Sequence, residues 1–145
     1  MASYNKFRVF TLDLVQGTHN FTNTTGNVFK VMLTNVAPVN TNTIKANLTE
    51  ITGGGSTGYT AGGTVTTMTT STTTGTAKVV GTDVVFTAGS AGMGPFQYAV
   101  LYNDTSTSPA DPLIAWWDYG SAISLLENET FTVDFDGSAG IFTIA

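Results

Sequence analysis

The sequence predicts an all-β protein: an antiparallel β-sandwich or jelly roll with a short N-terminal helix or arm. The chain has 28 threonines and 16 glycines among 145 residues; threonine suits pleated strands, and glycine supplies the turns between them. Hydrophobic residues make up 41% of the chain, which is enough for a packed core. From residue 64 onward, short alternating segments follow one another, separated by glycine-rich turns.

We expect a single domain over residues 1–145, because a chain of this length buries about two-thirds of its unfolded surface around one core. In this interpretation residues 1–17 form an N-terminal helix or arm, and residues 28–34 form a first strand. Residues 35–63 form a long loop, and residues 64–145 form the main β body. A loop of that length in a compact domain is usually functional or an arm.

The N-terminal segment reads as a helix over residues 3–15. Ser3 is a suitable cap, and Gly17 follows as the stop. Large apolar side chains recur at spacings of three and four residues, at Tyr4, Phe7, Phe10 and Leu14. Val9 and Leu12 break this pattern, so a strand remains the alternative.

Strand signals cover most of the remaining chain. In residues 28–34, Phe29, Val31 and Leu33 share one face. The loop at 35–63 contains two glycine runs and is expected to hold one helical turn near residues 44–48. Later strands are expected at residues 64–71, 76–80, 83–87, 96–102, 113–119, 130–135 and 141–144, the first two forming a hairpin.

The segment PLIAWWDYG holds both tryptophans, and strand alternation separates them. Ile114, Trp116 and Asp118 share one face, and Asp118 marks that face as the outer one. Ile114 and Trp116 then require a cover. It is either the loop or N-terminal helix of the same chain, a neighbouring subunit, or a sugar stacked on the indole. By the same alternation Phe96, Tyr98, Val100 and Tyr102 share a face of their own strand.

Charge is divided between the two halves of the chain. All five basic residues lie in the first 78 positions with two acids, and eight acids follow with no base. The halves therefore carry +3 and −8. This pattern fits either a solvated acidic surface on the later strands, or docking in which a basic end meets an acidic neighbour.

The residue inventory disfavours catalysis, cofactors and metals. Cysteine is absent and His19 is the single histidine, for which we expect a turn position bonded to backbone. The DFDG segment at 134–137 lacks the further ligands of a calcium loop and predicts a strand end with a tight turn. Glu127 and Glu129 resemble an acid/base pair only by spacing, because nothing in the sequence indicates a cleft. We therefore expect no enzyme activity, no cofactor and no metal.

Nucleic acid and membrane are also disfavoured as partners. A net charge of −5 opposes binding to phosphate backbones. No apolar run approaches the ~18 residues of a membrane span. The first 17 residues carry Lys6, Arg8 and Asp13 within them, so they lack the unbroken apolar core of a signal peptide.

Several segments resemble a family of small structural proteins of tailed bacteriophages and prophages. They are SYNKF, THNFTN, VFKVMLTNVAPVNTNTIKANLTEI, GYTAGG and a C-terminal stretch from GPFQYAV to GIFTI, in which LYNDTSTSPADPLIAWWDYG is the most specific part. The resemblance covers nearly the whole chain, and the threonine-rich segment at 64–76 is its least typical region. It implies a virion protein made in the host cytoplasm, and specifically a capsid decoration or cement protein on the outer surface of the head.

The implied partners are the major capsid protein and copies of the protein itself, as a dimer or trimer. Candidate interface residues are Ile114 and Trp116, the N-terminal aromatics Phe7 and Phe10, and the cations Lys6 and Arg8, which would meet acidic groups on the partner. The alternative is a tail, neck or fibre-associated virion protein that binds host carbohydrate through its aromatic residues.

Overall fold

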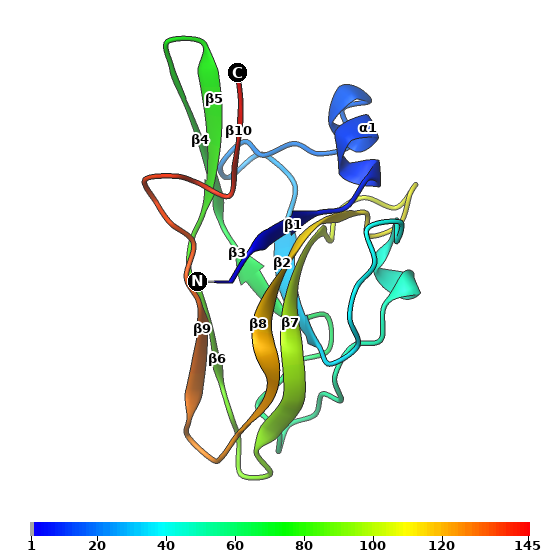
Figure 1. Ribbon diagram of the computed structural model, residues 1–145, viewed down its shortest axis with the longest axis vertical. Helices are drawn as coiled ribbons and strands as arrows, with labels where there is room; N and C mark the ends of the chain where they lie inside the picture. The colour runs from blue at the N-terminus through cyan, green and yellow to red at the C-terminus, as the bar shows by residue number, and fades with distance from the viewer. Residues whose placement is uncertain (1) are drawn as a thin grey trace.

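Antiparallel strands dominate the structure, a computed structural model that describes residues 2–145 (Figure 1). The strands are β1 (Tyr4–Lys6), β2 (Phe29–Thr34), β3 (Thr64–Thr66), β4 (Met68–Thr73), β5 (Thr76–Gly81), β6 (Val84–Thr87), β7 (Met93–Asn103), β8 (Leu113–Leu125), β9 (Thr130–Val133) and β10 (Phe142–Ile144). Helix α1 (Val9–Val15) and the 3-10 turn η1 (Lys45–Asn47) interrupt them. The predicted all-β class with one short N-terminal helix is confirmed. Neither helical segment in residues 2–145 has the length or apolar character of a membrane span.

The strands form two layers. One is a five-stranded sheet in the order β1-β8-β7-β2-β3. The other contains the three-stranded sheet β10-β5-β4 and the two-stranded sheet β6-β9, which follow each other along the chain at β5–β6 and β9–β10. All pairings are antiparallel, and the predicted β4–β5 hairpin is present.

The main core fills the space between the two layers. Side chains of β2, including Phe29, Val31 and Leu33, meet side chains of the second layer such as Val84 and Phe135. The alternation predicted for β2 is therefore confirmed. Helix α1 closes one end of this core, because its Phe10 is 2% exposed and its ring lies 5.0 Å from that of Phe142.

The five-stranded sheet is also buried on its other face. An outer-face cluster lies there, composed of Phe7, Met32, Val100, Tyr102 and Leu113. The segment between β2 and β3 lies over this face and is held by backbone bonds, such as Leu113 N to Thr43 O at 3.0 Å and Ile51 N to Leu33 O at 3.1 Å. The long loop predicted at 35–63 is confirmed with its helical turn, and it acts as a cover for the sheet.

The N-terminal helix begins later than its sequence pattern predicts. Tyr4 to Lys6 form strand β1, which pairs with Trp117 to Ala115 of β8. The prediction of helix from Ser3 is wrong because three residues gain a sheet partner, whereas an isolated helical turn there gains little. The helix ends as predicted before Gly17, which adopts a φ of +72°.

Irregular pairing between β7 and β8 changes which side chains share a face. Leu101 pairs with Ala115 and Tyr102 with Leu113, so Ile114 is an extra residue in β8. A β-bulge of this kind reverses the alternation beyond it. Ile114 therefore packs in the main core, whereas Trp116 packs against the outer-face cluster. The prediction that these two residues share a face is wrong.

A second irregularity lies further along the same pair of strands. The register shifts between Phe96 and Tyr98. Phe96 is buried in the main core, while Val100 and Tyr102 belong to the outer-face cluster. The prediction that Phe96 shares a face with Val100 and Tyr102 is therefore wrong for the same physical reason.

Candidate interaction surface

The segment from Lys6 to Arg8 runs along the β8 edge of the five-stranded sheet. Phe7 N donates a hydrogen bond to Ile114 O at 3.1 Å, and Arg8 N donates to Asn40 O at 2.9 Å. These backbone bonds fix the segment between β8 and the loop at 35–63. Lys6 and Arg8 are both exposed, and Phe7 between them is fully buried.

Three of the six predicted interface residues belong to the core of the monomer. Phe7 and Ile114 are 0% exposed, and Phe10 is 2% exposed. The prediction that these side chains contact a partner is wrong, because the main core and the outer-face cluster already enclose them. Of the covers considered for Ile114, the structure supplies the one within the same chain.

Trp116 is the one predicted apolar contact that keeps part of its surface open. It is partly buried, and its ring centroid lies 4.5 Å from that of Phe7 with the planes tilted by 45°. Lys6, Arg8 and the open part of Trp116 lie along the same strand edge, which we call the N-terminal edge surface. The register pairs Lys6 with Ala115 and Asn5 with Trp116, so the Lys6 side chain and the indole lie on opposite faces of this edge. The structure thus brings together three of the predicted residues along one strand edge.

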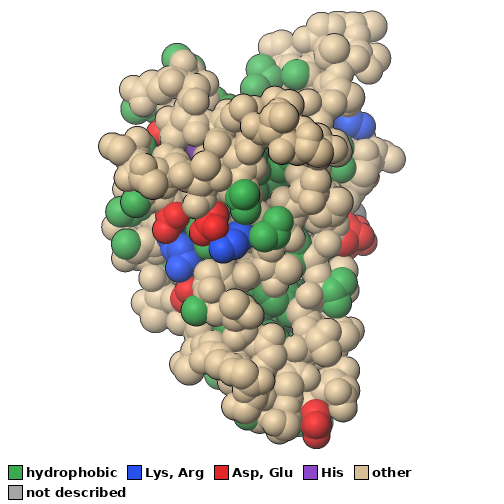
Figure 2. Space-filling model, turned by 180° about the vertical axis from the view of Figure 1, so that it is seen from behind, with side chains coloured by type: hydrophobic (Ala, Val, Ile, Leu, Met, Phe, Trp, Pro, Cys, Tyr) green, Lys and Arg blue, Asp and Glu red, His purple; other side chains and the backbone are tan. Residues whose placement is uncertain are grey.

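Most other cations of the chain are already engaged. Lys30 pairs with Asp104 at 2.7 Å and Lys45 with Glu50 at 3.0 Å. Figure 2 shows basic and acidic side chains next to one another on the face that it draws. Lys78 donates to two carbonyl oxygens, those of Gly137 and Ser138.

The two cations of the N-terminal edge surface make fewer interactions. Lys6 Nζ donates to Thr11 Oγ1 at 2.9 Å, and neither Lys6 nor Arg8 forms an ion pair within residues 2–145. Their charges are therefore uncompensated within the described part of the chain, on a protein whose net charge is −5.

A row of aromatic rings lies beside β8, and all of them except the buried Phe135 are at least partly exposed. Tyr4 meets Trp117 at 5.9 Å, Trp117 meets Phe135 at 5.3 Å, and Tyr119 meets Phe131 at 5.7 Å. Burial raises the pKa of Tyr4 to about 12, so its hydroxyl remains neutral at physiological pH. Alternation does place Trp117 and Tyr119 together, but it gives no sign that Tyr119 is exposed.

A shallow hollow of about 550 Å³ adjoins this row. Its lining residues are Ala2, Ser3, Asn5, Asp118, Tyr119 and Gly120. Asp118 Oδ1 accepts hydrogen bonds from Gln97 Nε2 at 2.9 Å and from Gly120 N at 2.7 Å. The hollow therefore presents one carboxylate, one amide and one tyrosine ring.

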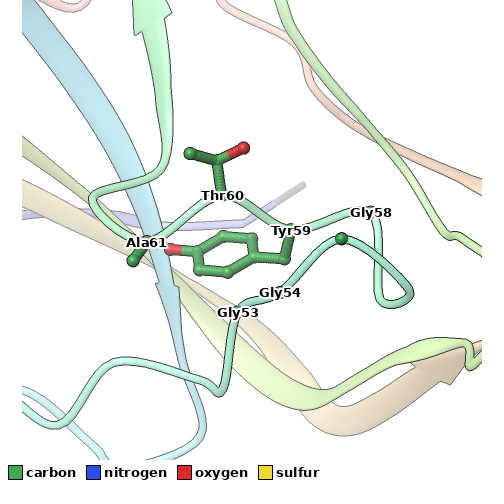
Figure 3. A pocket seen from close by; sticks show the side chains of 7 residues that line it. Gly53, Gly54, Gly58, Tyr59, Thr60 and Ala61 are labelled. Atoms are coloured by element: carbon green, nitrogen blue, oxygen red, sulfur yellow. The ribbon is translucent and has the colours of Figure 1, made fainter.

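A second hollow, of about 540 Å³, lies against the glycine-rich loop between η1 and β3 (Figure 3). Tyr59 is buried beside it, where its hydroxyl donates to Glu50 Oε1 at 2.6 Å and accepts from Leu33 N at 3.1 Å. Burial and the neighbouring Glu50 raise the pKa of Tyr59. This tyrosine holds the loop to the sheet, and no other lining residue carries a titratable group.

The remaining candidate chemical groups have structural environments. His19 is buried and accepts at Nδ1 a hydrogen bond from Asn103 Nδ2 at 3.1 Å, so the prediction of a backbone-bonded turn histidine is wrong. Burial lowers the pKa of His19 to about 4.

Glu129 accepts a hydrogen bond from Leu126 N at the turn between β8 and β9. Asp136 accepts from Ser138 N and Ala139 N, as expected for a tight turn in the DFDG segment. Within residues 2–145 no three acidic or histidine side chains cluster as metal ligands would.

The fold and its surfaces thus describe a small β-sandwich with a basic edge, a partly open tryptophan and an aromatic row. Comparison with protein-family models, curated proteins and solved structures finds no match to this chain.

Proposed function

We propose that this protein is a structural component of a tailed-bacteriophage virion, specifically a capsid decoration or cement protein. It is made in the host cytoplasm and binds the outer surface of the head. Its partners are the major capsid protein and neighbouring copies of itself, without a role for nucleic acid, membrane, cofactor or catalysis. The resemblance of residues 101–120 to phage virion proteins supports this role.

The observation that carries the proposal is the N-terminal edge surface. Lys6 and Arg8 are exposed and lack acidic partners within the described residues, while part of the Trp116 indole is open on the other face of the same strand edge. Arginine and tryptophan are the residue types that most often dominate binding energy at interfaces. Two free cations on an acidic protein select an acidic patch on the partner.

The rigidity of this surface favours binding. Backbone bonds from Phe7 and Arg8 hold the segment to β8 and to the loop at 35–63 before any partner arrives. Little conformational entropy is then lost on docking. A standard interface buries about 800 Å² per partner, and a symmetric shell repeats each modest contact many times.

The test is occupancy on purified particles. Replacing Lys6→Gln and Arg8→Gln together should lower the number of copies per particle about tenfold at low salt, and the difference from the wild type should shrink at high salt, where these charges are screened. The matched control carries Ser90→Glu and Asn128→Asp, which change the net charge equally at exposed turns. A wild-type protein present at hundreds of copies supports a place on the shell. A handful of copies, or equal loss in the control, contradicts this function.

The aromatic row favours a second candidate, a tail or fibre-associated protein that binds host carbohydrate. Tyr119 is 55% exposed and borders a hollow that also presents Asn5 and Asp118. An exposed ring with adjacent carboxylate and amide groups is suited to stacking and hydrogen bonding with a sugar. Quenching of tryptophan fluorescence by host polysaccharide, lost in Tyr119→Ala, would support this candidate. No quenching at any polysaccharide concentration would exclude it.

A further inference from the structure

The β4–β5 hairpin projects from the body of the molecule (Figure 1). Strand β5 has β10 on one side and β4 on the other. Strand β4 lies at the outer edge of that sheet, and within residues 2–145 no strand pairs with its free side. An edge of this kind presents a row of backbone donors and acceptors to solvent.

The pairing register shows which groups point outward. The hairpin turns at Thr74 and Gly75, which have φ values of 48° and 85°, and Thr73 pairs with Thr76. In a two-residue turn with both φ values positive, the flanking pair exchanges hydrogen bonds, and bonding then alternates along the strand. The backbone groups of Met68, Thr70 and Thr72 therefore face away from β5.

Strand β4 has none of the features that usually block an open edge. Its sequence MTTSTT contains no charge, proline or glycine, and Thr69 to Thr73 are all exposed. Proteins commonly protect edges with lysine, proline, bulges or short strands. The other edge strands of this fold are shorter: β1, β3 and β10 have three residues each, and β6 and β9 have four each. The free part of β8 contains Asp118, and Gly120 at a φ of +98°.

We propose that β4 is a self-association strand, which pairs antiparallel with β4 of a second copy about a two-fold axis at Thr70. This register is self-complementary, because Thr70 then lies opposite its own equivalent and Met68 lies opposite Thr72 of the second copy. About six backbone hydrogen bonds would join the two strands. Threonine pairs across strands are favourable, and no charge on either strand opposes them.

A second copy fits this edge better than an unrelated chain does. The partner must present an uncharged strand of equal length. Its outward-facing backbone N–H and C=O groups must also lie opposite those of β4, and an identical β4 meets both conditions by symmetry. Lys78 is the one cation on the adjoining strand β5, and two carbonyl oxygens already hold its Nζ. This inference does not depend on the proposed capsid role.

Light scattering and sedimentation of the purified full chain test the proposal. The wild type should have about twice the mass of the 15.2 kDa monomer at concentrations near 100 μM and dissociate on dilution. Thr70→Pro removes the outward N–H at the axis while leaving the bonds between β4 and β5 intact, and should weaken association about tenfold or more. Thr70→Ala keeps the backbone and should associate nearly as the wild type does.

Amide hydrogen exchange of the wild-type protein provides a second test, and this test does not depend on whether any variant folds. The Thr70 and Thr72 amides should exchange freely in dilute solution and become protected as the concentration rises. The Ser71 amide, bonded to β5, should be protected at both concentrations. A wild type that is monomeric throughout, Thr70→Pro that associates normally, or Thr70 protection that is independent of concentration would each overturn the proposal. The result leaves the particle-occupancy test unaffected, so the two can fail separately.

Discussion

The ring of Phe7 lies 4.5 Å from that of Trp116, and the two side chains differ in exposure. Phe7 is fully buried in the outer-face cluster, whereas Trp116 keeps part of its surface open at the sheet edge. The tryptophan thus has a buried side that stabilises the fold and an open side that a partner could cover. Stability and binding can be separated experimentally at this pair.

We expect Phe7→Ala to cost more stability than Trp116→Ala. Removing a fully buried phenylalanine typically costs about 3–5 kcal/mol, while the partly open tryptophan should cost about 2 kcal/mol. Chemical denaturation of both variants measures the difference. Trp116→Ala should remain folded at 25 °C but show reduced particle occupancy. An unfolded Trp116→Ala variant would make Trp116 a core residue and remove it from the N-terminal edge surface.

Glu50 is predicted to anchor the loop at 35–63. One carboxylate oxygen accepts from Tyr59 Oη at 2.6 Å and from Gly62 N at 2.5 Å, and the other lies 3.0 Å from Lys45 Nζ. Glu50→Ala leaves these donors without their acceptor and should lower the free energy of unfolding by about 2–3 kcal/mol. A double-mutant cycle with Tyr59→Phe should show coupling of about 1 kcal/mol. Strict additivity would mean that the short contact contributes nothing.

Stability should fall with acid over the range in which His19 titrates. Its pKa is about 4 in the folded protein, against an ordinary value of 6.5, because burial disfavours the charged ring. Between pH 6.5 and 4 the unfolded chain takes up this proton and the folded chain does not, so the free energy of unfolding decreases as pH falls. Urea denaturation across this range measures the slope, and His19→Gln should flatten it.

The titration of Asp13 changes the free energy of unfolding in the opposite direction. Its Oδ2 lies 3.8 Å from His19 Nε2, and burial raises its pKa. The folded protein therefore takes up the Asp13 proton before the unfolded chain does, which favours folding as pH falls through that window. Asp13→Asn should remove this opposing contribution and make the acid-induced loss steeper. A shallower loss in Asp13→Asn would contradict the assignment.

Gly63 should tolerate no side chain. It has a φ of +80°, and an added Cβ would collide with the carbonyl oxygen of Val31 on the neighbouring strand. Gly63→Ala should therefore destabilise the protein by about 2 kcal/mol or more, through strain and a displaced β2–β3 pairing. Gly55 is the matched control: a Cβ there meets nothing within 4 Å. Thermal unfolding should show a clear loss for Gly63→Ala and little change for Gly55→Ala.

The sequence predicted correctly those elements whose structure depends mainly on residues that are close together in the chain. Threonine-rich alternation and glycine turns located β2, the β4–β5 hairpin and most of the later strands. The strand predicted at 64–71 is wrong as one element, because it divides into β3, which pairs with β2, and β4, and β8 continues to Leu125 beyond its predicted end. The turn at Asp136 follows from its side chain, which accepts two backbone N–H bonds. Because such features depend on neighbouring residues in the chain, the sequence alone predicts them.

Which side chains share a face of the long strands depends on contacts between strands, and the sequence pattern does not show these contacts. Ile114 is an extra residue relative to β7, and this bulge separates it from Trp116. Burial of Phe7 and Phe10 likewise depends on where β1 and α1 dock. Lys6 and Arg8 are exposed, as charged side chains usually are, and their lack of an ion pair within residues 2–145 could be suggested by the sequence only through the uneven distribution of charge.

The bulge at Ile114 has a consequence for engineering and for natural variation. Deleting that one residue would restore regular alternation from Leu113 onward, because Trp116 would still lie opposite Val100 and Trp117 opposite Ala99. A length change of a single codon would therefore remove a fully buried side chain from the main core while leaving the same indole on the outer face.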